Sequence, residues 1–132
     1  MRLELSKDQI RQLWFAIGCG IVVAIIVLSL IPEPTFGDAT GIDKVEHALA
    51  YGTLMLWFAQ LYLRARWLWV AFLCLALGVL LEYAQRLTGL RSFGYDDMVA
   101  NAVGVGLGWM LACAGLNDWV LRVERWAGAT AS

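Results

Sequence analysis

Residues 13–31 read LWFAIGCGIVVAIIVLSLI, a run without a single charged side chain. A helix needs roughly 20 mostly apolar residues to cross the hydrocarbon core of a bilayer, so this run predicts a membrane span. Three more runs of similar length and character lie at residues 47–63, 67–85 and 98–116. The sequence therefore predicts an all-α integral membrane protein, built as a four-helix bundle with short loops.

The composition of the whole chain supports a membrane protein. Of 132 residues, 61% are hydrophobic and 16% are charged, and the mean hydropathy is +0.67. A soluble domain usually has about 45–50% apolar and about 25% charged residues. The net charge of −1 provides no electrostatic basis for binding nucleic acid. Cys19, Cys74 and Cys113 lie inside apolar runs without a CxxC motif, which argues against a disulfide framework or a structural zinc site.

Four spans leave little chain for a second domain, so residues 1–132 are expected to form a single transmembrane domain. The first apolar run is longer than the apolar core of a signal peptide, about 7–15 residues, and is expected to be retained as a span. Residues 117–132 form the tail. Within it, residues 117–126 alternate apolar and charged side chains, which is typical of a short amphipathic helix on the membrane surface.

The basic residues predict the orientation of a multi-pass protein. Seven of them lie in the N-terminal segment, in the turn between the second and third spans, and in the tail, whereas three lie on the other side. Basic residues are enriched in cytoplasmic segments of membrane proteins. Both termini are therefore expected in the cytoplasm, and the loops after the first and third spans outside.

Ionisable residues at membrane depth are costly and by default mark a functional site or a paired network. At the start of the second span, helical spacing places Asp43, Lys44, His47 and Tyr51 along one face. A second group follows the end of the third span and the start of the fourth, comprising Glu82, Gln85, Arg91, Asp97 and Asn101. In the predicted topology these helix ends share the outer membrane face. The two groups are therefore expected to converge in one polar pocket.

Gly104 and Gly108 follow Asn101 along the same helical stripe. A GxxxG spacing lets a neighbouring helix approach closely, and it would draw Asn101 toward the interior of the bundle. Simpler interpretations exist for the polar residues. His47 suits a hydrogen-bonded position at headgroup level, Asp43 and Asp97 suit helix N-caps, and Glu82 suits a structural ion pair with Lys44 or Arg91.

Taken in order and with their spacing, these residues resemble the VanZ-like family of small bacterial membrane proteins over roughly residues 25–110. The motifs that carry the resemblance are Ser29-x-x-Pro32, Asp43-Lys44-x-x-His47-x-x-x-Tyr51, Gly78-x-x-x-Glu82-x-x-Gln85, Arg91 and Asp97-x-x-x-Asn101-x-x-Gly104-x-x-x-Gly108. The resemblance implies a protein of the bacterial inner membrane and cell envelope. The family is named for a member linked to teicoplanin resistance, so the resemblance also implies a link to glycopeptide tolerance.

Two hypotheses for the function remain open at this point. In the first, the pocket binds or modifies a lipid or cell-envelope precursor at the outer membrane face. Glu82 and His47 would handle protons, and Asp97 would supply a constant charge. Lys44 and Arg91 would hold an anionic group of the ligand. The remaining contacts with the ligand would come from Gln85, Asn101, Tyr51 and Asp43.

A divalent cation on Asp43, Glu82 or Asp97 would suit such chemistry. No nucleophile motif points to a particular reaction, so enzymatic activity stays open. In the second hypothesis the protein is not an enzyme, and the polar cluster only stabilises the bundle or its assembly with a partner. In both, the lipid bilayer is the surrounding medium, and the sequence carries no signal for an oligomeric state.

Overall fold

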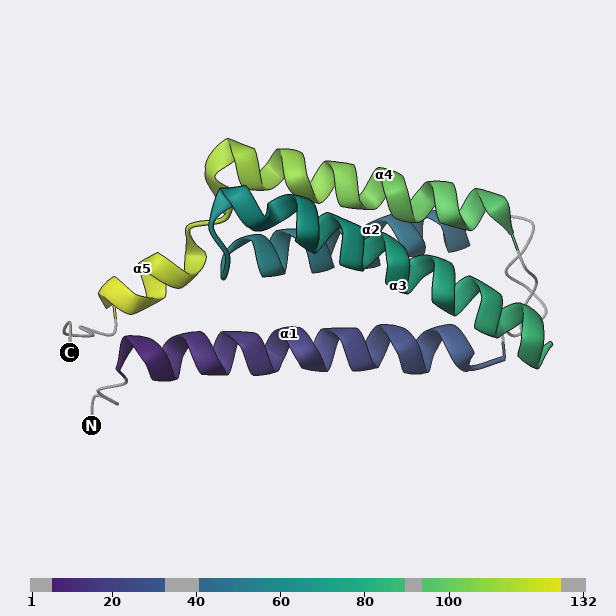
Figure 1. The fold of residues 1–132 in the computed structure, drawn as a ribbon, viewed down its shortest axis with the longest axis horizontal. Helices are drawn as coiled ribbons and strands as arrows, with labels where there is room; N and C mark the ends of the chain where they lie inside the picture. Colours follow the sequence, from purple (N-terminus) through teal and green to yellow (C-terminus); the bar gives the residue numbers. More distant parts are fainter. Residues whose placement is uncertain (1–5, 33–40, 90–93, 127–132) are drawn as a thin grey trace.

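The computed structural model describes residues 6–32, 41–89 and 94–126. These residues form five α-helices and no strand, which confirms the all-α prediction. The helices are α1 (Lys7–Leu30), α2 (Ile42–Ala59), α3 (Trp67–Thr88), α4 (Tyr95–Leu111) and α5 (Trp119–Trp126) (Figure 1). A 3₁₀ turn, η1 (Arg64–Arg66), precedes α3, and a π-helical turn, η2 (Ala112–Leu116), joins α4 to α5.

Three helical segments are long and apolar enough to cross a membrane, namely Lys7–Leu30, Arg64–Thr88 and Tyr95–Leu116. The predicted spans at 67–85 and 98–116 lie within two of them, and the span at 13–31 overlaps the first in all but its last residue. The predicted span at 47–63 corresponds to α2, which is not among the three. Its 18 residues include Asp43, Lys44 and Glu46 in the first turns, and it ends at Ala59. The prediction of four spans in a four-helix bundle is therefore met only in part.

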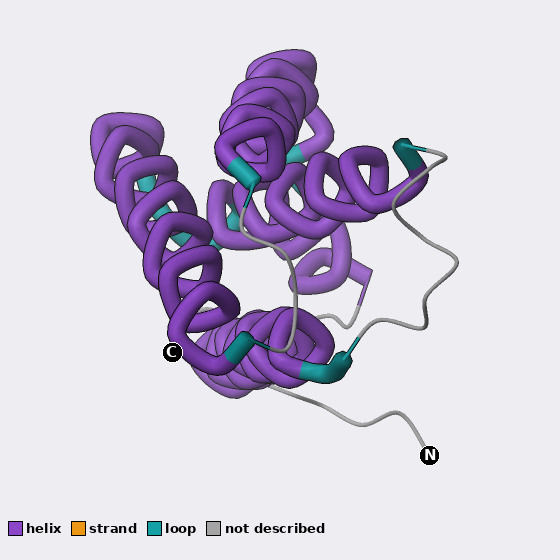
Figure 2. The backbone as a smooth tube through the Cα atoms, turned by 90° about the vertical axis from the view of Figure 1, so that its right-hand side faces the viewer, coloured by secondary structure: helices purple, strands orange, loops and turns teal. Residues whose placement is uncertain are grey.

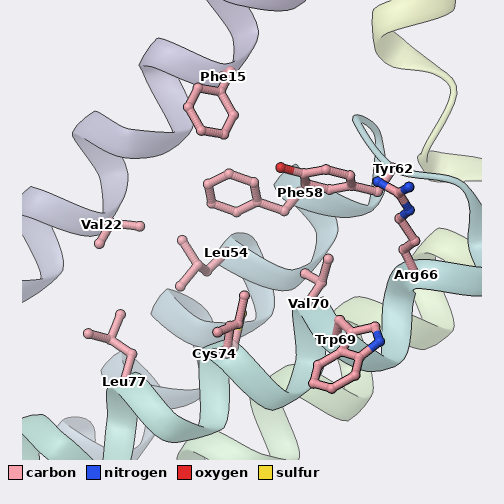
Figure 3. Close-up of a pocket in the computed structure, with 11 residues that line it drawn as sticks. Phe15, Val22, Leu54, Phe58, Tyr62, Arg66, Trp69, Val70, Cys74 and Leu77 are labelled. Atoms are coloured by element: carbon pink, nitrogen blue, oxygen red, sulfur yellow. The ribbon is translucent and has the colours of Figure 1, made fainter.

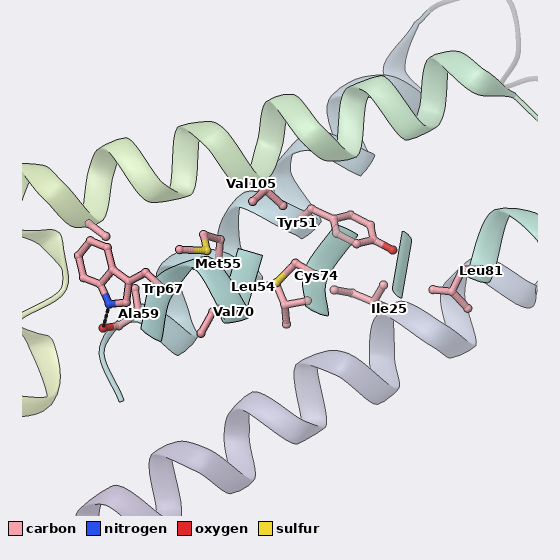
Figure 4. Close-up of a cluster of buried hydrophobic side chains, with 11 residues drawn as sticks. Ile25, Tyr51, Leu54, Met55, Ala59, Trp67, Val70, Cys74, Leu81 and Val105 are labelled. Carbon is pink, nitrogen blue, oxygen red and sulfur yellow. Dashed lines mark hydrogen bonds between the residues drawn. The ribbon is translucent and has the colours of Figure 1, made fainter. Parts of the chain in front are cut away.

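The hydrophobic core lies mainly between α2 and α3 (Figure 4). Tyr51, Leu54 and Met55 of α2 are each at most 2% exposed. Trp67 begins α3 inside this core, and its Nε1 donates to the carbonyl oxygens of Ala59 and Tyr62, both at 3.1 Å. The indole thereby holds the turn between the two helices.

Helices α2 and α4 approach each other backbone to backbone. A Cβ atom added at Gly104 would collide with the carbonyl oxygen of Ala48, and one at Gly108 would collide with that of Gly52. The prediction that Gly104 and Gly108 admit a neighbouring helix is confirmed. The sequence analysis missed the partner stripe Ala48-x-x-x-Gly52, whose signal is the same spacing of small residues.

The molecule has two distinct ends (Figure 1). At the loop end, α1 and α3 end while α2 and α4 begin; at the terminal end lie the start of α1, η1 and α5. Figure 2 looks from the loop end and shows the helices inclined to one another. The predicted tail helix is present as α5 over Trp119–Trp126. It packs against α1, where Arg11 Nε lies 3.0 Å from Oε1 of the buried Glu124.

Candidate functional site

The structure gathers most of the predicted polar residues at the loop end. We call this set the polar cluster; its described members are Asp43, Lys44, His47, Tyr51, Glu82, Gln85, Asp96, Asp97 and Asn101. They come from the start of α2, the end of α3 and the start of α4. Arg91, which was predicted to belong with them, lies outside the described residues.

The inner part of the cluster joins α2 to α4. His47 Nδ1 lies 2.9 Å from Asn101 Oδ1, and Asn101 is 2% exposed. Gly78 on α3 makes room for this pair, because a Cβ there would lie 2.7 Å from Asn101 Nδ2 and 3.3 Å from the ring of Tyr51. The predicted turn of Asn101 toward the bundle interior is confirmed.

Glu82 is 1% exposed and faces the same interior. Its Oε1 accepts a hydrogen bond from the backbone N–H of Gly94 at 2.6 Å, which ties α3 to the start of α4. The carboxyl group also interacts electrostatically with Asp97 and His47. An ion pair with Lys44 or Arg91 was predicted for Glu82. The pair with Lys44 does not form, since Lys44 pairs with Asp43, Asp96 and Asp97, and Arg91 lies outside the described residues.

Gln85 is 2% exposed and completes the end of α3. Its Nε2 donates to the carbonyl oxygen of Ser29 at 2.8 Å, so it links α3 to α1. Through this hydrogen bond the side-chain amide stabilises the packing of the two helices. Ser29 had been noted only for its place in the family motif.

The outer part of the cluster surrounds Lys44. Its Nζ lies 2.9 Å from Asp96 Oδ2, 3.2 Å from Asp43 Oδ2 and 3.9 Å from Asp97 Oδ1. The Asp96 and Asp43 carboxylates raise the pKa of the Lys44 ammonium above its usual range. Lys44 is thus a fixed cation among three carboxylates. Asp96, the neighbour of Asp97 in the sequence, is its nearest partner.

The N-cap interpretation of Asp43 and Asp97 is wrong. The N-cap residues of α2 and α4 are Gly41 and Gly94, which have no side chain to offer. Both aspartates lie inside the first turn, where the helix dipole favours negative charge. Their side chains are only 15% and 14% exposed. Within the described structure, neither Asp43 Oδ1 nor Asp97 Oδ1 has a hydrogen-bond partner.

The cluster does not present a metal centre in the part of the chain that the structure describes. No group of three or more His, Cys, Asp or Glu side chains there is arranged to hold a metal ion. The arrangement instead offers carboxylate acceptors with one ammonium donor between them.

Two open cavities reach the cluster from the apolar sides. A groove of about 710 Å³ between α2 and α4 runs from Lys44 and Asp96 down to Leu107 and Leu111. A second one of about 550 Å³, between α1 and α2, is lined by apolar side chains and by Ser29, Glu46, His47 and Tyr51. Each cavity joins an apolar surface to a polar end, and both volumes are typical of sites for small molecules.

One family model, described as VanZ/LLP1, matches residues 8–116. No curated protein and no solved structure matches the chain.

Proposed function

The chain belongs to the VanZ/LLP1 family, and on that premise we propose that it is an integral protein of the bacterial inner membrane that binds an amphiphilic lipid or cell-envelope precursor. The headgroup binds at the polar cluster, and a hydrocarbon chain lies in the groove between α2 and α4. Four helices, α1 to α4, form the membrane bundle in this proposal, and the loop end faces the outside.

The observation that carries the proposal is the continuity of the α2–α4 groove with the cluster. Its apolar part is lined by side chains such as Leu49, Val103 and Leu107, and its polar end by Lys44 and Asp96. A molecule with a hydrocarbon chain and a polar headgroup matches this division, because burying the chain removes apolar surface from water.

The polar groups indicate the chemistry of the headgroup. Lys44 suits an anionic group such as a phosphate. However, three carboxylates surround Lys44, so a ligand with negative charge alone would be repelled. Asp43 Oδ1 and Asp97 Oδ1, which have no hydrogen-bond partner among the described residues, would accept hydrogen bonds from hydroxyl or amino groups. The favoured ligand therefore combines an anionic group with such donors, as a phospholipid or a lipid-linked sugar does.

Modification of the ligand is a second candidate function, favoured by the contact between His47 and Asn101. Since the amide oxygen of Asn101 is an acceptor, His47 Nδ1 donates to it, and the neutral ring then has Nε2 as a proton acceptor. In this proposal Glu82 and His47 handle protons while Asp97 supplies a constant charge. Tyr51, Gln85 and Asn101 hold these groups and the ligand in place.

The alternative is a purely structural cluster. It is supported by the hydrogen bonds that join helices, those of Glu82 to Gly94, Gln85 to Ser29 and His47 to Asn101. In this case the substitutions Glu82→Gln and His47→Ala would lower the amount of folded protein. If the cluster is a binding site, both variants should reach wild-type protein levels.

The deciding experiment is a test of teicoplanin tolerance in a sensitive bacterial host. Cells making the wild-type chain should tolerate more teicoplanin than cells with an empty vector. The variants His47→Ala, Glu82→Gln and Asp97→Asn should lose this gain at equal protein level. The control Asp8→Asn removes a carboxylate at the other end of the molecule and should keep the gain. Full function of all three cluster variants would show that the cluster is scaffolding, and no gain with the wild-type chain would refute the link to teicoplanin.

A further inference from the structure

A third cavity, a groove, lies at the opposite half of the molecule, between α1 and α3 over the side of α2. It has a volume of about 530 Å³ and is lined almost entirely by apolar side chains, among them Val22, Leu54, Phe58 and Leu73 (Figure 3). Helices α1 and α3 both belong to candidate membrane spans. The groove therefore opens toward the hydrocarbon interior of a bilayer rather than toward water.

One end of this groove is polar. Figure 3 shows the Tyr62 and Arg66 side chains at the end near the turn between α2 and α3, with Leu77 at the far end; the Tyr62 hydroxyl points into the groove toward Phe58, away from the Arg66 guanidinium. Arg66 is exposed, and none of the described acidic side chains forms an ion pair with it. A guanidinium binds phosphate with paired hydrogen bonds.

The surroundings of Arg66 are basic as well. Among the described residues of the terminal end, the basic side chains are Lys7, Arg11, Arg64, Arg66, Arg122 and Arg125, and the acidic ones are Asp8, Asp118 and Glu124. At the loop end acidic residues are in excess, as described above for the polar cluster. An anionic headgroup is therefore attracted to the Arg66 end, and basic pockets between membrane helices are typical sites for such headgroups.

We infer that this groove is a binding site for an anionic membrane phospholipid. One acyl chain lies between α1 and α3, and the phosphate contacts Arg66. The occupant comes from the leaflet at the terminal end, because an acyl chain reaching the groove from that side leaves its headgroup at Arg66. This site shares no described residue with the polar cluster, so it does not depend on the function proposed for that cluster.

The test is native mass spectrometry of the purified protein, released from detergent that contains equal amounts of dioleoyl phosphatidylglycerol and dioleoyl phosphatidylcholine. The wild-type protein should retain phosphatidylglycerol in preference to phosphatidylcholine. Arg66→Gln should reduce that preference about tenfold, since it removes a charge-assisted hydrogen bond. Arg64→Gln is the matched control. It changes the same turn, but Arg64 contacts Cys113 and the Trp67 ring and does not line the groove, so the preference should persist.

A second pair of variants tests the acyl-chain part of the site. Leu73→Trp adds bulk inside the groove and should reduce retention of both lipids, whereas Leu80→Trp, an exposed position on α3 outside the groove, should not. Equal retention of the two lipids by the wild-type protein, or equal effects of the Arg66 and Arg64 substitutions, would overturn the inference. A wild-type dimer that is dissociated by Leu73→Trp but not by Leu80→Trp would also overturn the inference, because the groove would then bind a second copy of the chain.

Discussion

The Glu82 side chain is nearly inaccessible, and a single backbone N–H explains how the fold accommodates it. The start of α4 has free N–H groups, as every helix does in its first turn. Gly94 directs its N–H at Glu82 Oε1, so two groups that would each be costly to bury alone satisfy one another. Gln85 does the same for the Ser29 carbonyl near the end of α1. Buried polar groups of α3 thus bind the helix ends to each other.

At the residue scale we predict that Glu82→Leu destabilises the protein more than Glu82→Gln. Glutamine retains an oxygen that accepts from Gly94, whereas leucine leaves the half-buried N–H of Gly94 without this partner. An unsatisfied buried group costs about 1–3 kcal/mol. Thermal unfolding in detergent, followed by circular dichroism, should show this difference in the free energy of unfolding. Equal stability of the two variants would mean that the hydrogen bond contributes nothing.

At the scale of elements, the contact between α2 and α4 determines the geometry of the site. Gly104 and Gly108 lie against the carbonyl oxygens of Ala48 and Gly52, so no side chain separates the two backbones. This close approach brings His47 within hydrogen-bond distance of Asn101 and aligns the first turns of the two helices. Because the carboxylates of both first turns then surround Lys44, the helix contact also assembles the outer part of the cluster.

We predict that Gly104→Ala and Gly106→Ala have opposite effects on stability. The added methyl group of Gly104→Ala meets the Ala48 backbone and should lower the free energy of unfolding by about 1–3 kcal/mol, as overpacking does. A Cβ at Gly106 meets nothing within 4 Å, so the better helix propensity of alanine should raise stability by up to about 1 kcal/mol. Thermal unfolding of both variants in the same detergent checks the signs. A stable Gly104→Ala variant would contradict the proposed backbone contact.

At the scale of the whole molecule, charge separates the two ends. Basic side chains are in excess near the start of α1, η1 and α5, and acidic ones at the loop end, among the residues that the structure describes. This asymmetry supports an orientation with the terminal end in the cytoplasm. The ligand sites proposed for the two ends differ accordingly, with a headgroup rich in donors at one and an anionic headgroup at the other.

Cysteine labelling tests this orientation. In a background without Cys19, Cys74 and Cys113, Asp38→Cys should react with a membrane-impermeant maleimide added outside the cytoplasmic membrane. Ala65→Cys in η1 is the control on the opposite side and should react only after the membrane is permeabilised. If Asp38→Cys were labelled only from the cytoplasm, the protein would have the opposite orientation to the one predicted.

Much of this protein could be predicted from its sequence, because apolar runs and helical spacing are local properties. The spans at 67–85 and 98–116, the inward turn of Asn101 and the close approach at Gly104 and Gly108 all follow from the order of residues along single helices. Most members of the polar cluster were also predicted from the sequence, because a charged side chain inside an apolar run needs a polar partner in any fold.

The partners themselves depend on which helices meet, and only the tertiary structure decided them. Lys44 is surrounded by Asp43, Asp96 and Asp97 instead of pairing with Glu82, because α2 and α4 begin side by side and Glu82 faces Gly94. Gln85 donates to a backbone carbonyl on α1. No sequence pattern predicts this contact, because every residue has a backbone carbonyl. Likewise, the groove that ends at Arg66 exists because α1 and α3 leave space beside α2, and a cavity between helices distant in the sequence is a property of their packing alone.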